Sequence, residues 1–191
     1  FASALMLVAE KKPQLIPIKK LVELSNSNDI KILESVIKIL GIVGGKNPAE
    51  AIAILKKAMN DSDWSIKTAA TESLAKLSNT NDASADGILV EIKKMMGSNE
   101  KWTRLKAIEV LAEIGERSPE KIHKLMKLDE MTSIITNSKE DVDIRIAAMK
   151  VFGILAQTQF EKAYPTIIKM FSDKNEKIRE AMIGGLMRTA E

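Results

Sequence analysis

The feature that most constrains how this chain can fold is a short apolar–basic pair that recurs along it. The pair occurs as Ile30-Lys31, Ile66-Lys67, Thr103-Arg104, Ile144-Arg145 and Ile178-Arg179. Its basic members are separated by 36, 37, 41 and 34 residues. A period in this range is typical of proteins built from stacked helical repeats. The spacing therefore predicts a repeat array that fills nearly the whole chain.

Each repeat is predicted to consist of two helices joined by a short polar turn. In residues 48–59 the apolar residues Ile52, Leu55 and Met59 are three and four positions apart, as on one face of a helix. A polar turn follows, and a second amphipathic helix is expected over residues 64–77. The same order recurs along the chain, which predicts a leading half-repeat, 1–12, and five repeats, 13–46, 47–82, 83–117, 118–158 and 159–191.

More specific predictions can be made for the first helix of two of the repeats. A continuous helix is expected over residues 13–24, and the first helix of the fourth repeat is expected to break near Asp129.

Neither helix of a repeat can bury its apolar stripe alone, so neighbouring repeats are expected to share one core. The fold class is predicted to be all-α, a right-handed superhelix in a single domain over residues 1–191.

Residues 53–70 and 165–179 resemble HEAT repeats of the armadillo-like superfamily. The family carries an aspartate in the turn inside each repeat and a basic residue six positions later, and Asp61/Lys67 and Asp173/Arg179 match this spacing. The resemblance implies a ladder of hydrogen bonds between neighbouring repeats, formed by Asp61, Lys67, Arg104, Asp141, Arg145, Asp173 and Arg179. Ser98 and Lys139 replace the turn aspartate in two repeats, where Glu100 and Asp141 are candidate substitutes.

The composition argues against several classes of function. The chain has no cysteine, and His123 is its one histidine, so thiolate metal sites, histidine clusters and most catalytic triads are excluded. We therefore expect no enzyme activity and no cofactor. The absence of cysteine is compatible with a cytoplasmic location. The chain does not begin with methionine and is expected to be part of a longer protein.

Exposed positions on the second helices are the first candidates for binding a partner. The superfamily places these helices on its concave side, where this chain has Glu72, Lys76, Glu109, Glu113, Lys150 and Arg188. A lining of mixed charge suits a protein or peptide partner better than duplex DNA, which needs a basic lining. The alternative is that this face is merely solvated.

A second candidate is a ridge of lysines near the ends of the first helices, which would attract nucleic acid or an anionic membrane surface. Its members are Lys19, Lys20, Lys56, Lys57, Lys93, Lys94 and Lys169. Lysines in a last helical turn also stabilise the helix by binding its terminal carbonyls, and that interpretation is preferred. The net charge of +3 is small for a nucleic-acid-binding protein.

A third candidate is an apolar end that could mediate self-association, formed by Met182, Ile183, Leu186 and Met187. Trp64 and Trp102 stand at the start of two second helices, where packing into the turn is preferred to a role as interface anchors. No small-molecule substrate is evident from the sequence. The preferred hypothesis is a non-enzymatic scaffold that binds another protein.

Overall fold

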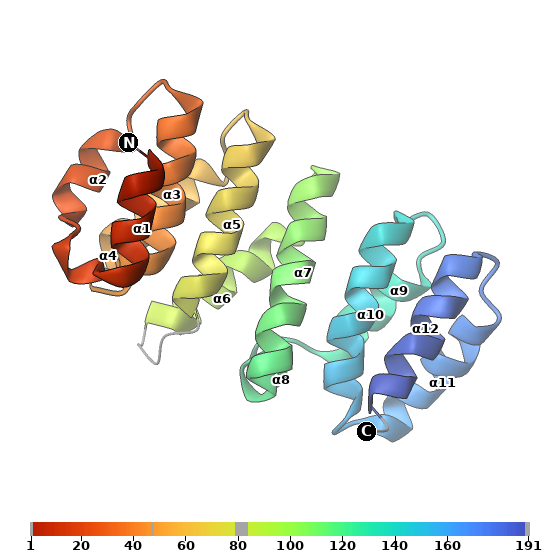
Figure 1. The fold of residues 1–191 in the computed structure, drawn as a ribbon. Coiled ribbons are helices and arrows are strands. Elements are labelled where there is room, and N and C mark those ends of the chain that lie inside the picture. The colour runs from red at the N-terminus through yellow and green to blue at the C-terminus, as the bar shows by residue number, and fades with distance from the viewer. Residues whose placement is uncertain (1, 47, 79–83, 190–191) are drawn as a thin grey trace. The chain divides into compact units, whose positions relative to one another are not determined.

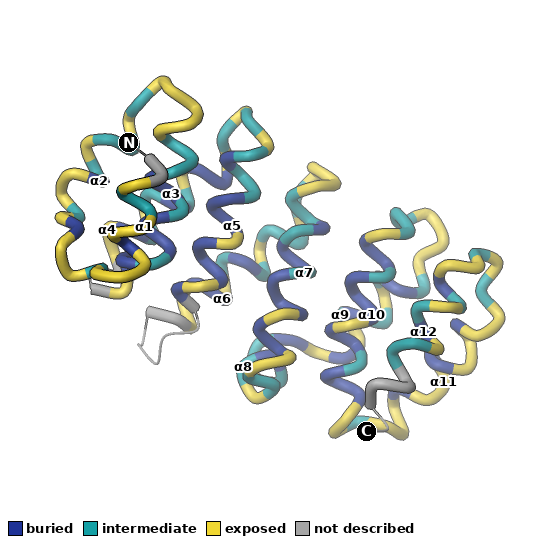
Figure 2. Tube along the Cα trace, in the orientation of Figure 1, coloured by how far each residue is buried: buried dark blue, intermediate teal, exposed yellow. Residues whose placement is uncertain are grey.

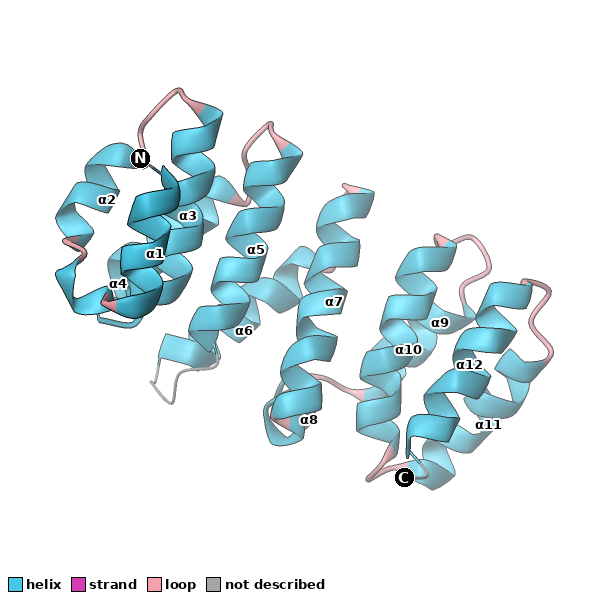
Figure 3. Ribbon diagram, in the orientation of Figure 1, coloured by secondary structure: helices cyan, strands magenta, loops and turns pink. Residues whose placement is uncertain are grey.

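The computed structural model describes residues 2–46, 48–78 and 84–189, and all regular structure in these ranges is helical (Figures 1 and 3). The α-helices are α1 (Ala2–Lys11), α2 (Ile18–Leu24), α3 (Ile30–Val43), α4 (Pro48–Ala58), α5 (Trp64–Ser78), α6 (Ser84–Met95), α7 (Lys101–Arg117), α8 (Pro119–Leu125), α9 (Leu128–Thr136), α10 (Val142–Ala156), α11 (Phe160–Phe171) and α12 (Glu176–Thr189). Short 3-10 helices cover Pro13–Leu15 and Gly44–Lys46. The prediction of an all-α helical-repeat fold is confirmed.

The chain divides into two compact units, Phe1–Ile92 and Lys93–Glu191, and the boundary between them in the sequence falls within α6. We refer to them as the N-terminal and the C-terminal unit. The single domain expected from the sequence stays a prediction.

In the N-terminal unit, the second helices α3 and α5 pack closely along their length. Gly41 of α3 makes this approach possible, because a Cβ atom at this position would lie 2.7 Å from the Cβ of Ser73 on α5. The buried hydroxyl of Ser73 donates a hydrogen bond to the carbonyl of Ile37, 3.0 Å away. Leu21 of α2 and Leu55 of α4 complete the core beside these helices.

In the C-terminal unit, α10 is the central element. It packs against α7, α8, α9 and α12, and most of its trace is coloured as buried (Figure 2). Ile144, Ala148, Phe152 and Leu155 are almost completely inaccessible to solvent. The buried residues of α10 also include Ala147 and Ile154 on one side of this stripe and Met149 and Ala156 on the other, so the helix is enclosed by neighbours on more than one side.

In two repeats, the first helix differs from the sequence prediction. The helix expected over residues 13–24 is divided, because Pro17 has no N–H to donate and holds the preceding Ile16 in an extended conformation. The break expected near Asp129 lies earlier, at Met126 and Lys127, and α9 begins at Leu128. The carboxylate of Glu130 accepts the N–H of Lys127 and so stabilises the new helix start.

Candidate functional site

The ladder residues of the C-terminal unit are bound to one another and to backbone carbonyls. Arg145 is 3% exposed, and its Nη2 lies 2.5 Å from Oδ2 of Asp173, which belongs to the turn of the following repeat. Its Nε donates to the carbonyl of Ile135 at 2.7 Å. The hydrogen bond from Arg145 is the main reason that the pKa of Asp173 is lowered. Arg179 donates to the backbone carbonyl of Asp173 at 2.8 Å.

Arg104 forms an equivalent connection to the next repeat, but with an acid that the sequence analysis did not name. Its Nη2 lies 2.8 Å from Oε1 of Glu140, and its Nη1 donates to the carbonyl of Ser98. Asp141, one of the two proposed substitutes, instead caps α10 and lies 2.7 Å from Nζ of Lys101. The hydrogen bond from Lys101 is the main reason that the pKa of Asp141 is lowered.

The remaining ladder residues lie in the N-terminal unit. Asp61 accepts the N–H of Asp63 within its own turn, at 2.9 Å, and Lys67 is half-buried near the start of α5. Arg104 and Arg145 thus contact the following repeat, whereas the contact of Asp61 lies within its own turn.

The lysine ridge is partly neutralised by neighbouring acids. Nζ of Lys56 lies 3.3 Å from Glu91, and Nζ of Lys93 lies 2.9 Å from Glu130 in the following repeat. Lys93 also donates to the carbonyl of Leu125. The remaining members lie at or near the surface, where Lys20 is paired with Glu23, Lys57 bonds to Asn26, and Lys19, Lys94 and Lys169 are exposed. These ion pairs reduce the positive charge that the ridge could offer to an anionic polymer.

An apolar pocket of about 730 Å³ lies between α10, α11 and α12. Its walls include Met149 and Phe152 from α10, Phe160 and Ile167 from α11, and Met182 from α12. Lys150 is the one charged residue among the described residues that line it. Ligand-binding pockets in proteins typically measure about 300–1,000 Å³ and have this mainly apolar character.

Glycines in the middle of two helices keep this pocket open. A Cβ atom added at Gly153, Gly184 or Gly185 would meet no described atom within 4 Å outside its own helix backbone and chain neighbours. At Gly115 of α7, by contrast, a Cβ atom would lie 2.6 Å from Cδ1 of Ile154. The glycine at 115 is therefore required by helix packing, whereas Gly153, Gly184 and Gly185 leave space unfilled.

A smaller cavity of about 300 Å³ adjoins the pocket and shares Met149, Lys150, Gly153, Gln157 and Gly185 with it. It extends to Gly115, Glu116 and Pro119 at the junction of α7 and α8. We call the two cavities together the α10–α12 groove. Lys150 and Gly153 lie where the two cavities meet.

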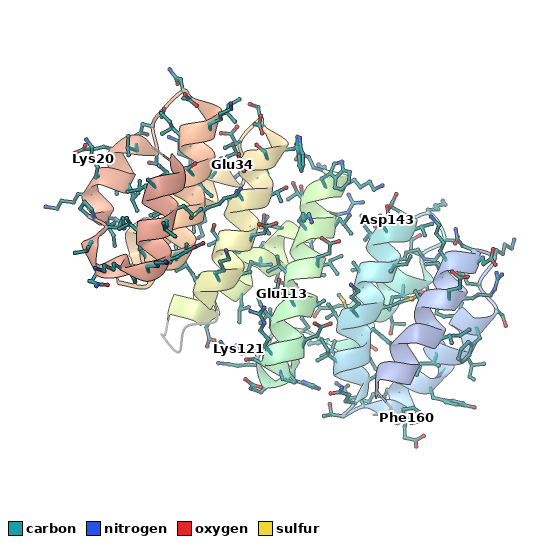
Figure 4. All side chains as sticks on the ribbon, in the orientation of Figure 1. Lys20, Glu34, Glu113, Lys121, Asp143 and Phe160 are labelled. Atoms are coloured by element: carbon teal, nitrogen blue, oxygen red, sulfur yellow. The ribbon has the colours of Figure 1, made fainter. Side chains whose placement is uncertain are left out.

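Among the residues predicted for the concave face, Lys150 lines the groove. Glu109 lies 2.9 Å from Lys106, and the exposed Glu113 lies 2.8 Å from Arg117 within the same helix (Figure 4). In the N-terminal unit, Glu72 and Lys76 are exposed on α5. The side chain of Arg188 lies outside the described residues.

The predicted apolar end is divided between buried and exposed positions. Met182 is buried and lines the pocket, whereas Ile183 is exposed. The side chains of Leu186 and Met187 lie outside the described residues.

The two tryptophans do not pack into the turns, contrary to the preferred prediction. Trp64 is 70% exposed and Trp102 is 62% exposed. Nζ of Lys101 lies 5.8 Å from the centre of the Trp102 ring, within the range of a cation–π interaction. Both rings therefore contribute little to the cores of their units.

An exposed apolar stripe on α11 was missed by the sequence analysis. Its members are Phe160, Tyr164, Ile168 and Phe171, which lie on the helix beside the buried face of Ala163, Ile167 and Met170. Phe160 and Tyr164 are neighbours on this stripe, with ring centres 6.1 Å apart (Figure 4 labels Phe160). The available signal was the width of the apolar face of this helix, which exceeds what packing on one side needs.

In the described part of the chain, no three histidine, aspartate or glutamate side chains are grouped so as to hold a metal ion. None of the described helices combines the length and the apolar character required to cross a lipid bilayer.

Comparisons with known proteins agree with this architecture. The family model described as HEAT repeats matches residues 18–92, which lie in the N-terminal unit. No curated protein shows significant similarity to the chain. A designed armadillo repeat protein, solved in complex with the peptide (KR)4, is 15% identical and superposes with a TM-score of 0.60, covering 97% of this chain and 90% of that one.

Two further solved structures have similar folds. The Kap121p mutant D353K/E396K/D438K gives a TM-score of 0.63 at 16% identity, over 93% of this chain and 21% of that one. The complex of CpcE and CpcF of phycocyanin lyase from Nostoc sp. PCC7120 gives 0.55 at 17% identity, over 92% and 66%. The repeat period, the helical architecture and these matches lead to one conclusion: the chain has the fold of HEAT/armadillo-like repeat proteins, and its residues 18–92 match the HEAT-repeat family model.

Proposed function

We propose that this protein is a non-enzymatic scaffold that holds a segment of another protein in the α10–α12 groove. The observation that carries the proposal is the apolar pocket of about 730 Å³, whose walls come from three helices of the C-terminal unit. Peptide binding by a protein of this fold supports it, since the designed armadillo repeat protein was solved with a bound peptide. The partly neutralised lysine ridge gives less support to binding of nucleic acid or a membrane surface.

The proposal is tested by filling the groove without changing its walls. Gly153→Phe places an aromatic ring in space that no described atom occupies. A library of short displayed peptides is selected against the wild-type chain, and the dissociation constant of each enriched peptide is measured for both proteins. We expect the variant to lose binding.

Gly87→Phe is the matched control, because a Cβ atom at Gly87 also meets open space but the residue lies on α6, outside the groove. Binding should survive in this variant. Failure to enrich any peptide on the wild-type chain would overturn the proposal, as would equal binding by Gly153→Phe and the wild-type chain.

A second candidate function is self-association, favoured by the exposed stripe on α11. Ile168 lies five residues before the turn aspartate Asp173, the position that Lys56 and Lys93 occupy in their repeats. Those lysines bind the next repeat, through Glu91 and Glu130. An apolar residue at this position suits contact with another apolar helix better than contact with water.

Sedimentation over a range of concentrations tests this second function. We expect the wild-type mass to rise with concentration and Ile168→Glu to stay monomeric, with Lys162→Glu on the same helix as the control. A wild-type chain that is monomeric at every concentration would exclude it.

A further inference from the structure

We infer that the segment held by the α10–α12 groove is an extended peptide that carries an aromatic side chain next to an acidic one. This inference rests on the proposed function, and it adds the chemistry of the partner. It is argued from the pocket walls, from the glycine at the junction of the cavities and from Lys150.

The walls of the larger cavity favour an aromatic anchor. Met149 and Phe152 come from α10, and Met182 comes from α12. Methionine side chains adapt to the shape of a guest, and their sulfur atoms make favourable contacts with aromatic rings. Aromatic side chains are also the ones that most often dominate binding energy when they fill an apolar pocket.

The junction of the two cavities favours an extended backbone. Gly153 lies there without a side chain, so the main chain of a partner can approach the surface of α10 closely. A helical partner would hold its backbone away from this surface, because a helix with its side chains is roughly 10–12 Å wide. An extended segment can place one side chain in the larger cavity and continue over Gly153 toward Gly115 and Pro119.

Lys150 determines the charge next to the anchor. Its side chain is exposed at the edge of both cavities, and it forms no ion pair with any described residue. Lys150 is the charged residue in the described lining of the larger cavity, and Glu116 lines the smaller cavity beyond it. A carboxylate beside the aromatic anchor would pair with this amine, and a basic residue there would be repelled.

The test uses the peptides that the displayed library enriches on the wild-type chain. We expect them to share an aromatic residue with aspartate or glutamate within two positions of it. Replacing the aromatic residue by alanine should weaken binding by about thirtyfold or more, as at other buried anchors. Lys150→Glu should weaken binding by about fivefold, which is the usual scale for one exposed ion pair.

Charge reversal on the peptide supplies the decisive comparison. A peptide with lysine in place of its acidic residue should bind Lys150→Glu better than it binds the wild-type chain. Lys162→Glu, on α11, is the matched control, and it should bind both the original and the charge-reversed peptide as the wild-type chain does. Circular dichroism of each variant verifies that the helices are retained.

The outcomes separate the inference from the proposed function. If enriched peptides lack an acidic preference and Lys150→Glu binds them as the wild-type chain does, the inference is wrong and the groove remains a binding site. If Gly153→Phe binds the peptides with unchanged affinity, the proposed site itself is wrong. Reversal of the charge preference by Lys150→Glu, together with loss of binding in Gly153→Phe, supports both.

Discussion

Arg145 on α10 and Asp173 in the turn before α12 form a buried ion pair that joins two successive repeats, with Nη2 and Oδ2 2.5 Å apart. The same arginine binds the carbonyl of Ile135 in its own repeat. One side chain thus connects the turns of two repeats, in a position where water has almost no access to it.

Loss of this pair should strongly destabilise the C-terminal unit. Arg145→Ala leaves Asp173 without its cation and the carbonyl of Ile135 without its donor, and breaking a buried pair typically costs about 3–5 kcal/mol. Urea titration measures the change in the free energy of unfolding. Arg117→Ala is the control, because its pair with Glu113 is exposed, and it should cost less than about 1 kcal/mol. Equal losses in the two variants would contradict the assignment of Arg145 to the core.

The stability of the protein should depend on pH through Asp173. Because Arg145 lowers the pKa of Asp173 in the folded protein, the unfolded chain binds this proton more readily. The resulting stabilisation is fully present above the ordinary aspartate pKa of about 4 and is lost as the pH falls through the lower pKa of the folded state. Asp173→Asn should therefore reduce the loss of stability between neutral and acidic pH in urea titrations. Identical slopes for the variant and the wild-type chain would refute this.

Alanine at two mid-helix glycines should have opposite effects. Gly153→Ala gains helix propensity without a clash, and it should raise the free energy of unfolding by roughly 0.5–1 kcal/mol. Gly41→Ala forces its Cβ against Ser73, and overpacking of this kind typically costs about 1–3 kcal/mol. Thermal and urea unfolding of both variants measure the difference. Stabilisation by Gly41→Ala would show that α3 and α5 are not held as closely as the structure indicates.

The exposed tryptophans give a spectroscopic prediction. Trp64 and Trp102 are the two tryptophans of the chain, so the emission of the folded protein should resemble that of tryptophan in water. Unfolding should shift the wavelength of this emission little, and acrylamide should quench the emission efficiently before and after unfolding. Trp64→Ala should change stability by less than about 0.5 kcal/mol, as is usual at the surface. A large blue shift in the folded state would contradict this exposure.

The repeat architecture could be read from the sequence because it depends on spacing. Apolar residues at helical intervals and a pair that recurs at a nearly fixed period determine where helices form and that they stack. The errors came from local chemistry: Pro17 interrupts a helix whose apolar pattern continues, and the break that was expected near Asp129 lies at Met126 and Lys127.

The candidate site was harder to predict, because it depends on distances between repeats. Glu140 and Asp141 are adjacent acids, and the conformation of the turn decides which one reaches Arg104. A glycine within a helix looks the same in the sequence whether a neighbour fills its space, as at Gly115, or not, as at Gly153. Lys150 was among the expected binding residues, but the pocket beside it was not foreseen.

The enclosure of α10 has a consequence for the rate of binding. A wall that is packed on α7, α8, α9 and α12 before any partner arrives has little conformational freedom left to lose. Association at the groove should then need no prior folding step, and differences in affinity between partners should reside mainly in how slowly each one leaves.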